Sequence, residues 1–156
     1  MDTDISVRKA ETENIERIKE ILFSSLEEYK IAVPDNYSVS DIDSINLENN
    51  SNWVFVLVRD DSVIGFIVLR PIAKDCIELK RLYLTSSERG RGLGEYLLNY
   101  AMHFAQKNKY RSIRLETTSK FKEAVSLYKK YGFNVLNDAE KSPGHDLVFE
   151  KTVWLS

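Results

Sequence analysis

The chain has 156 residues, of which 43% are hydrophobic and 29% charged, and these values exclude a disordered protein. Its 22 basic and 24 acidic side chains leave a formal net charge of −2, so we expect no nucleic-acid partner. No apolar run approaches the ~18 residues of a membrane span, and no signal-peptide pattern opens the chain. We therefore expect no membrane partner, and the single cysteine, Cys76, favours a reducing, cytoplasmic location.

Charge is divided unevenly along the chain. Residues 1–75 hold 8 basic and 15 acidic side chains, net −7, whereas residues 76–156 hold 14 basic and 9 acidic, net +5. One interpretation is that these charges are scattered over solvated faces. The alternative is that the second half holds an anionic ligand while the first half faces a cationic one.

The first half predicts a strand, two helices and three further strands. After a strand at Ile5–Lys9, Thr12 is expected to cap a helix with apolar residues at helical spacing. These residues are Ile15, Ile18, Leu22 and Leu26. A short helix is expected at Ser40–Leu47. The strands are expected at Trp53–Val58, which is continuously apolar and therefore buried on both faces, at Val63–Leu69, and, after a loop at Pro71–Asp75, at Ile77–Leu84.

The second half predicts two helices that alternate with strands. The first helix carries an apolar stripe from Leu93 to Ala105, and Asn108 is expected to end it in the left-handed conformation. Ser119 is expected to cap the second helix, which Gly132 ends. Strands are expected at Ser112–Thr117, Phe133–Leu136 and Leu147–Trp154. This order predicts an α/β protein with a mixed sheet covered by helices.

A glycine-rich segment, Arg89-Gly90-Arg91-Gly92-Leu93-Gly94, lies between a predicted strand and a long helix. Glycines let the backbone turn tightly and approach a ligand closely. The first turn of a helix offers N–H groups without intrahelical partners and the positive end of the helix dipole. Together with the two arginines, these features predict a site for phosphate or diphosphate.

Two other phosphate motifs do not fit this segment. A P-loop requires Gly-Lys-Ser/Thr, which is absent, and the glycines lack the last spacing of a dinucleotide fingerprint. For the glycines considered alone, a turn that binds no ligand stays the alternative.

Three ordered segments together resemble the GNAT superfamily of acyl-CoA-dependent N-acyltransferases. They are Glu78-Leu79-Lys80-Arg81-Leu82-Tyr83-Leu84, Arg89-x-x-Gly92-x-Gly94 and Ala124-x-x-Leu127-Tyr128-x-x-x-Gly132-Phe133. The resemblance implies one N-acetyltransferase domain over residues 1–156, with acetyl-CoA as cosubstrate. It also implies a central twisted, mostly antiparallel sheet with helices on both faces, in which the parallel strands Ile77–Leu84 and Ser112–Thr117 splay apart.

The resemblance also implies a cofactor site. Backbone amides of the glycine-rich segment would hold the CoA diphosphate, and the preceding strand would present main-chain groups to the pantetheine arm. The implied cofactor-binding residues are Leu82, Tyr83, Leu84, Arg89, Gly90, Arg91, Gly92, Leu93, Gly94 and Glu95. Phe121 is a departure, because many members carry an Asn there that contacts the cofactor. Ser119 and Lys122 are the neighbouring candidates for that contact.

The implied reaction is direct attack of a neutral primary amine on the thioester. Glu78 occupies a strand position where several members carry a general base, and Glu116 is the second candidate. The alternatives for Glu78 are a partner for Lys80 or Arg81, a solvated strand end, or a reaction that relays the proton through water. Tyr128 would direct its hydroxyl at the thioester sulfur, although its place in an apolar stripe also fits core packing.

Two further functions stay open, namely a catalytically silent acyl-CoA-binding sensor and a protein with this fold but no CoA site. For an enzyme, the acceptor is expected to be a small-molecule or peptide amine, and the acidic first half favours a cationic one. The spacing of cysteine and histidine predicts no metal site, and the sequence leaves a homodimer open.

Overall fold

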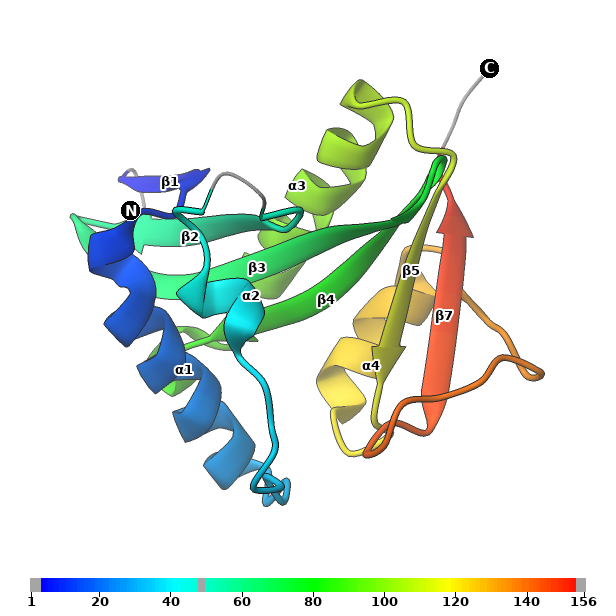
Figure 1. The fold of residues 1–156 in the computed structure, drawn as a ribbon, viewed down its shortest axis with the longest axis horizontal. Helices are drawn as coiled ribbons and strands as arrows, with labels where there is room; N and C mark the ends of the chain where they lie inside the picture. Colours follow the sequence, from blue (N-terminus) through cyan, green and yellow to red (C-terminus); the bar gives the residue numbers. More distant parts are fainter. Residues whose placement is uncertain (1–3, 48–49, 154–156) are drawn as a thin grey trace. The chain divides into compact units, whose positions relative to one another are not determined.

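The computed structural model describes residues 4–47 and 50–153 (Figure 1). This part of the chain contains a seven-stranded sheet in the order β1-β2-β3-β4-β5-β7-β6. The strands are β1 (Ile5–Lys9), β2 (Trp53–Arg59), β3 (Ser62–Ala73), β4 (Cys76–Leu84), β5 (Ser112–Thr117), β6 (Asn134–Val135) and β7 (Leu147–Thr152). β4 and β5 run parallel, whereas the pairs β1–β2, β2–β3, β5–β7 and β6–β7 are antiparallel. The predicted mixed, mostly antiparallel sheet is confirmed.

The helices of the described residues are α1 (Ile15–Glu28), α2 (Ser40–Asp43), α3 (Leu93–Lys107) and α4 (Lys122–Lys130), with 3-10 turns η1 (Thr12–Asn14) and η2 (Ser86–Glu88). None of these helices has the length and apolarity needed to cross a membrane. The chain forms two compact units. The first unit comprises Met1–Leu69 and Arg81–Leu97, and the second comprises Arg70–Lys80 and Leu98–Ser156.

The core of the first unit lies between α1 and the strands β2 and β3. α1 buries one apolar face, formed by Ile18, Ile21, Leu22 and Leu26. This face belongs to a cluster with Ile42 of α2, with Val54, Val56 and Val58 of β2, and with Phe66 and Val68 of β3. Figure 1 shows α2, in cyan, alongside α1, in blue. Five consecutive residues of β2 are buried, which confirms that this strand is covered on both faces.

The β2–β3 hairpin brings β3 against the end of β4. Its turn places Asp60 and Asp61 at φ +50° and +67°, the left-handed conformation that two-residue hairpin turns require. The register between β2 and β3 shifts between Leu57 and Val58, shortly before this turn. At Gly65 an added Cβ would lie 2.7 Å from Leu84 Cδ2 and 2.9 Å from Tyr83 O. Only glycine therefore allows β3 to approach the last residues of β4 this closely.

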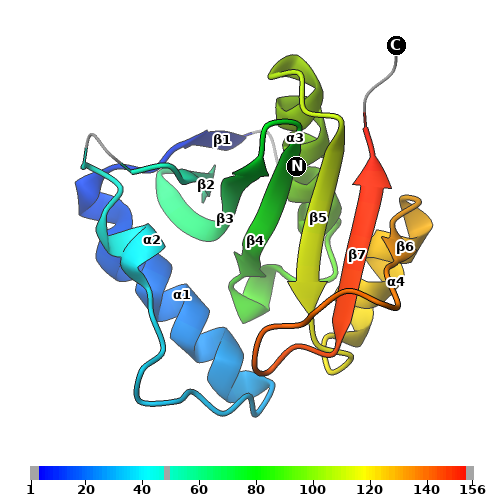
Figure 2. The same cartoon turned by 45° about the vertical axis from the view of Figure 1, so that its right-hand side comes forward.

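The second unit is built on the β5–β7 pair, which aligns Ser112 with Thr152 and Thr117 with Leu147. Ile113 and Leu115 of β5 and Val148 and Phe149 of β7 are buried. Figure 2 shows α4 behind this strand pair, where Tyr128 packs on Phe149 with ring centroids 5.8 Å apart. The parallel β4–β5 pairing covers only three positions, from Cys76–Ser112 to Glu78–Arg114.

Three predicted helix caps are wrong. Thr12 does not cap α1 but is the first residue of the 3-10 turn before it, where Glu11 and Asn14 form a reciprocal capping box. Lys109, at φ +65°, adopts the left-handed conformation expected of Asn108. Phe121 takes the N-cap position of α4, since the amide and hydroxyl of Ser119 donate to Asp146.

Three predicted element bounds also differ. β3 continues through Pro71 to Ala73, where a loop was expected. Its register with β2 starts at Leu69, so beyond that residue a proline costs no hydrogen bond to β2. α2 ends at Asp43 instead of Leu47, and β6 is limited to Asn134–Val135. The predicted end of the last strand, Trp154, lies outside the described residues.

Candidate functional site

The glycine-rich segment forms an open turn before α3. After β4, Thr85 N–H donates to Ile64 O at 2.9 Å, and η2 leads into the turn. Gly90 and Gly92 have φ of +76° and +81°, and a Cβ added at either would meet nothing within 4 Å. The backbone conformation therefore requires glycine, and open space lies beside both residues.

The start of α3 has the features of an anion site. Tyr96 N–H donates to Gly92 O at 3.0 Å, which is the bond that begins this helix. The N–H groups of the turn before it have no acceptor within a helix, and they lie at the positive end of the helix dipole. Gly94 is the second residue of α3, and Leu93 is buried. Glycine-rich turns at a helix N-terminus are typical phosphate- and diphosphate-binding sites.

The two arginines of the segment lie in different environments. The Arg89 side chain is 19% exposed and forms an ion pair with Glu28 of α1. The Arg91 side chain is 55% exposed, and its Nη1 lies 3.8 Å from Glu88 Oε1. Glu88 is itself paired with Arg59, at 2.9 Å. Arg91 is therefore the more accessible cation beside the glycines.

A buried ion pair, which the sequence analysis missed, anchors the segment between α1 and β2 to β4. Arg81 Nε and Nη2 donate to the two carboxylate oxygens of Asp41 at 2.8 and 3.1 Å. Nη1 donates to Tyr37 Oη at 2.5 Å, and Nη2 also donates to Ser38 O at 3.0 Å. The pKa of Arg81 is raised because the hydrogen bonds and charge of Asp41 outweigh the opposing effect of burial. These contacts fix Arg81, which directly precedes Leu82 and Tyr83 in β4.

The expected pantetheine-binding residues lie beyond the paired part of β4. The β4–β5 register ends at Glu78, and Leu82, Tyr83 and Leu84 follow it. The short pairing agrees with the splayed strands implied by the family resemblance. Leu84 O accepts a hydrogen bond from Arg89, so one main-chain group of this stretch is already used.

Glu78 of β4 lies in the second unit, where Arg70 is its ion-pair partner. Arg70 Nη2 lies 2.8 Å from Glu78 Oε1, and the Glu78 side chain is 12% exposed. Arg81, one of the predicted alternative partners, instead pairs with Asp41. The Glu78 carboxylate is therefore mostly buried, whereas its partner Arg70 is in contact with solvent, with a side chain that is 41% exposed.

Tyr128 belongs to the C-terminal cap of α4. Gly132, at φ +86°, donates to Lys129 O at 3.1 Å, and Phe133 N–H donates to Tyr128 O at 3.0 Å. These two bonds define a Schellman motif, and the Tyr128 and Phe133 rings make its apolar contact at 5.8 Å. The Tyr-x-x-x-Gly-Phe pattern therefore has a structural cause that involves the ring of Tyr128 and not its hydroxyl.

Glu116, the second base candidate, is bound to the loop at 137–146. Its two carboxylate oxygens accept hydrogen bonds from the amide and hydroxyl of Ser142, at 2.9 and 2.7 Å. Asp146 holds Ser119 in the same way, and these hydrogen bonds lower the pKa of Asp146. Both carboxylates thus order the polar loop.

The predicted residues divide between the two units. The cofactor-binding set, Leu82–Leu84 and Arg89–Glu95, lies in the first unit, whereas Glu78 and Tyr128 lie in the second. In the described part of the chain, no group of three or more His, Cys, Asp or Glu residues is placed to hold a metal ion.

Comparison with known proteins assigns this arrangement to a family. A model described as the acetyltransferase (GNAT) family matches residues 15–133. The chain belongs to this family. It is similar to an uncharacterized N-acetyltransferase of Escherichia coli K12, at 29% identity over 76% of this chain and 75% of that protein. A Schizosaccharomyces pombe N-acetyltransferase, also uncharacterized, is 29% identical over 62% of this chain, and the match covers 61% of that protein, less than two thirds.

Solved GNAT structures share the fold. A GNAT-family acetyltransferase from Staphylococcus aureus Mu50 superposes with a TM-score of 0.84 at 18% identity, covering 96% of this chain and 99% of the other. The PaiA N-acetyltransferase of Thermoplasma acidophilum, solved in complex with coenzyme A, has a TM-score of 0.74 at 25% identity, covering 95% of this chain and 98% of the other.

Proposed function

We propose that this GNAT-family chain is an N-acetyltransferase that transfers the acetyl group of acetyl-CoA to a primary amine. The observation that carries the proposal is the turn at Gly90 and Gly92, which has positive φ angles, open space beside both glycines and a position at the start of α3, all of which suit a diphosphate. The main-chain amides from Arg91 to Glu95 would hold that group, with Arg91 adding charge. Leu82–Leu84 would offer main-chain groups to the pantetheine arm.

When bound, acetyl-CoA supplies an acetyl thioester, whose carbonyl carbon bonds to the amine nitrogen while the carbon–sulfur bond breaks. An alkylamine has a pKa of about 10.4, so at pH 7 roughly one molecule in a few thousand is neutral. Glu78 would accept the proton that the amine loses. Tyr128 would donate a hydrogen bond to the sulfur as negative charge develops there.

The acceptor class is a small-molecule or peptide amine, and the acidic excess of residues 1–75 favours a cationic one. The cytoplasmic location stays a prediction based on the single cysteine. The single-domain organisation and a homodimer stay predictions too.

Titration with CoA and acetyl-CoA, followed by incubation with a panel of amines and measurement of thiol release, tests the proposal. We expect both ligands to bind and at least one amine to release thiol. If the protein binds both ligands but no amine in the panel causes thiol release, the silent acyl-CoA sensor is favoured. Absence of binding would contradict a CoA site in this chain.

A further inference from the structure

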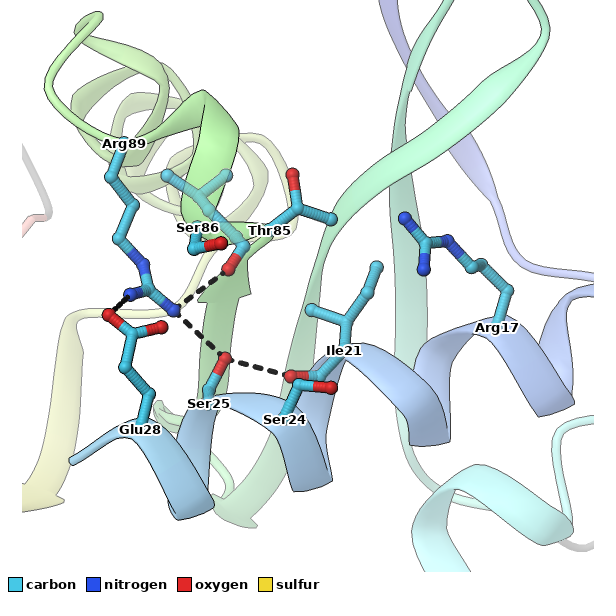
Figure 3. Close-up of a pocket in the computed structure, with 9 residues that line it drawn as sticks. Arg17, Ile21, Ser24, Ser25, Glu28, Thr85, Ser86 and Arg89 are labelled. Atoms are coloured by element: carbon cyan, nitrogen blue, oxygen red, sulfur yellow. Dashed lines mark hydrogen bonds and ion pairs between the residues drawn. The ribbon is translucent and has the colours of Figure 1, made fainter. Parts of the chain in front are cut away.

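The Arg89 side chain reaches Glu28 and Ser25 of helix α1 (Figure 3). One of its terminal nitrogens pairs with Glu28. The other donates to Ser25 Oγ at 3.1 Å and to Leu84 O at 3.2 Å. Ser25 Oγ in turn donates to Ile21 O at 2.8 Å, and the guanidinium lies 5.1 Å from the centre of the Tyr29 ring. One side chain thus ties α1 to the end of β4 and to the turn.

These contacts pair the positive charge of Arg89 with a carboxylate and occupy N–H donors of its guanidinium. Its carboxylate partner offsets the positive charge, and its planar fork is directed at three acceptors at once. Figure 3 shows these groups at one end of a cavity of about 190 Å³, with Arg17 at the other end. Arg89 is therefore poorly disposed to contact a phosphate directly, in contrast to the more exposed Arg91.

A glycine-rich turn needs an anchor, because glycine loses more conformational freedom on ordering than any other residue. Arg89 directly precedes Gly90, so fixing its side chain on α1 restricts the first peptide of the turn. A turn already held in its binding conformation avoids the entropy cost of ordering when the ligand arrives.

We propose that Arg89 is a positioning residue, which holds the glycine turn in its diphosphate-binding conformation through Glu28 and Ser25 of α1. Arg91 supplies the cation for the phosphates. The inference rests on the proposed function, because it assigns a role within the CoA site.

Glu28→Gln distinguishes a positioning role of Arg89 from direct phosphate binding, because the two roles predict opposite changes in CoA affinity. If Arg89 acted as a phosphate cation, removal of the neighbouring negative charge would tighten CoA binding. If Arg89 positions the turn, loss of the ion pair weakens binding. Arg89→Lys keeps the positive charge but loses the planar guanidinium that binds several acceptors at once. A positioning role therefore predicts that Arg89→Lys weakens CoA binding as much as Arg89→Met does.

The experiment measures CoA affinity by calorimetry and amide hydrogen exchange of residues 90–95 in the free protein. We expect Arg89→Lys, Arg89→Met and Glu28→Gln each to raise the Kd for CoA about tenfold and to speed exchange of these amides. The double variant Arg89→Met, Glu28→Gln should be no weaker than either single one, because all break the same contact. At saturating acetyl-CoA, kcat should stay within about threefold of wild type while KM for acetyl-CoA rises.

Arg17→Met is the matched control. Arg17 also belongs to α1 and lines the same cavity, but its contacts are with Val63 O and Glu20. We expect it to change neither CoA affinity nor exchange of the turn. A Glu28→Gln protein that binds CoA as tightly as wild type, or an Arg89→Lys protein with full affinity, would overturn the positioning role alone. A wild-type protein that fails to bind CoA would overturn the proposed function with it.

Discussion

Tyr128 combines two tasks that a single substitution can separate. Its ring makes the apolar contact of the α4 cap and packs on Phe149, whereas the proposed chemistry uses only its hydroxyl. Phe at this position keeps both ring contacts. The substitution therefore removes the hydroxyl while keeping these two ring contacts.

Tyr128→Phe is expected to lower kcat by about one to three orders of magnitude, because the hydrogen bond to the departing sulfur is lost. The Kd for CoA and the melting temperature should stay near their wild-type values. Tyr131→Phe, one turn further along, is the control and should keep full activity. Steady-state kinetics and calorimetry measure these effects, and unchanged turnover in Tyr128→Phe would refute the catalytic role.

The Arg70–Glu78 pair offers a similar separation. Glu78→Gln removes the proton acceptor, so kcat/KM should fall about 10²-fold or more. The rise of kcat/KM with pH that reports deprotonation of the general base should also disappear from the pH profile. Arg70→Gln removes the partner but leaves the carboxylate, and we expect activity within a few-fold of wild type. Equal losses in both variants would show that the ion pair is needed for structure and that Glu78 is not the base.

At the scale of elements, the conformation of the turn before α3 depends on Gly92. Gly92→Ala places a Cβ in the left-handed region, at a cost of about 1–2 kcal/mol, and we expect a CoA affinity at least tenfold weaker. Gly144→Ala is the matched control, since Gly144 also has a positive φ, +86°, and open space around it. Calorimetry should find its CoA affinity unchanged, and a parallel loss in both variants would attribute the effect to general destabilisation.

α2 is held to β4 by the buried Arg81–Asp41 pair. Asp41→Asn leaves the Arg81 charge uncompensated, so the free energy of unfolding should fall by about 3 kcal/mol. Asp43→Asn, on the same short helix, breaks a more exposed ion pair with Lys19 and should leave the free energy of unfolding nearly unchanged. Urea denaturation compares the two, and similar stabilities would contradict a structural role for the buried pair.

Elements with a strong local pattern could be predicted from the sequence, whereas contacts between distant residues could not. Ser112–Thr117 was predicted with its observed bounds, because its alternating apolar residues match a half-buried strand. The predicted cap at Ser119 failed because Asp146, 27 residues away, binds its side chain. The glycine turn was predicted from its composition. The Arg89–Glu28 and Arg81–Asp41 pairs, 61 and 40 residues apart, leave no signal in local sequence.

At the scale of the whole molecule, Tyr83 contributes to the pH dependence of stability in alkali. Burial, together with neighbouring Tyr37, raises the pKa of Tyr83 to about 12 from an ordinary value of 10.0. The folded state thus keeps the phenol proton after the unfolded state has lost it. The resulting stability is fully present below pH 10 and is lost as pH rises through 12.

Tyr83→Phe keeps the ring that stacks on Phe66 but has no proton to lose. Between pH 9 and pH 12, the wild-type free energy of unfolding should therefore fall by about 2 kcal/mol more than that of the variant. Urea denaturation at several pH values measures this difference. Parallel declines in the two proteins would show that Tyr83 is not responsible.

The account as a whole depends on the binding of a diphosphate by the amides at the start of α3. The most direct measurement is a ¹H–¹⁵N NMR titration of the wild-type protein with CoA and with pantetheine, which lacks the diphosphate. We predict that CoA shifts the amide signals of residues 91–95 more than any others, and that pantetheine leaves these signals in place. Binding of CoA with the signals of residues 91–95 unmoved, or no binding of CoA, would contradict the account.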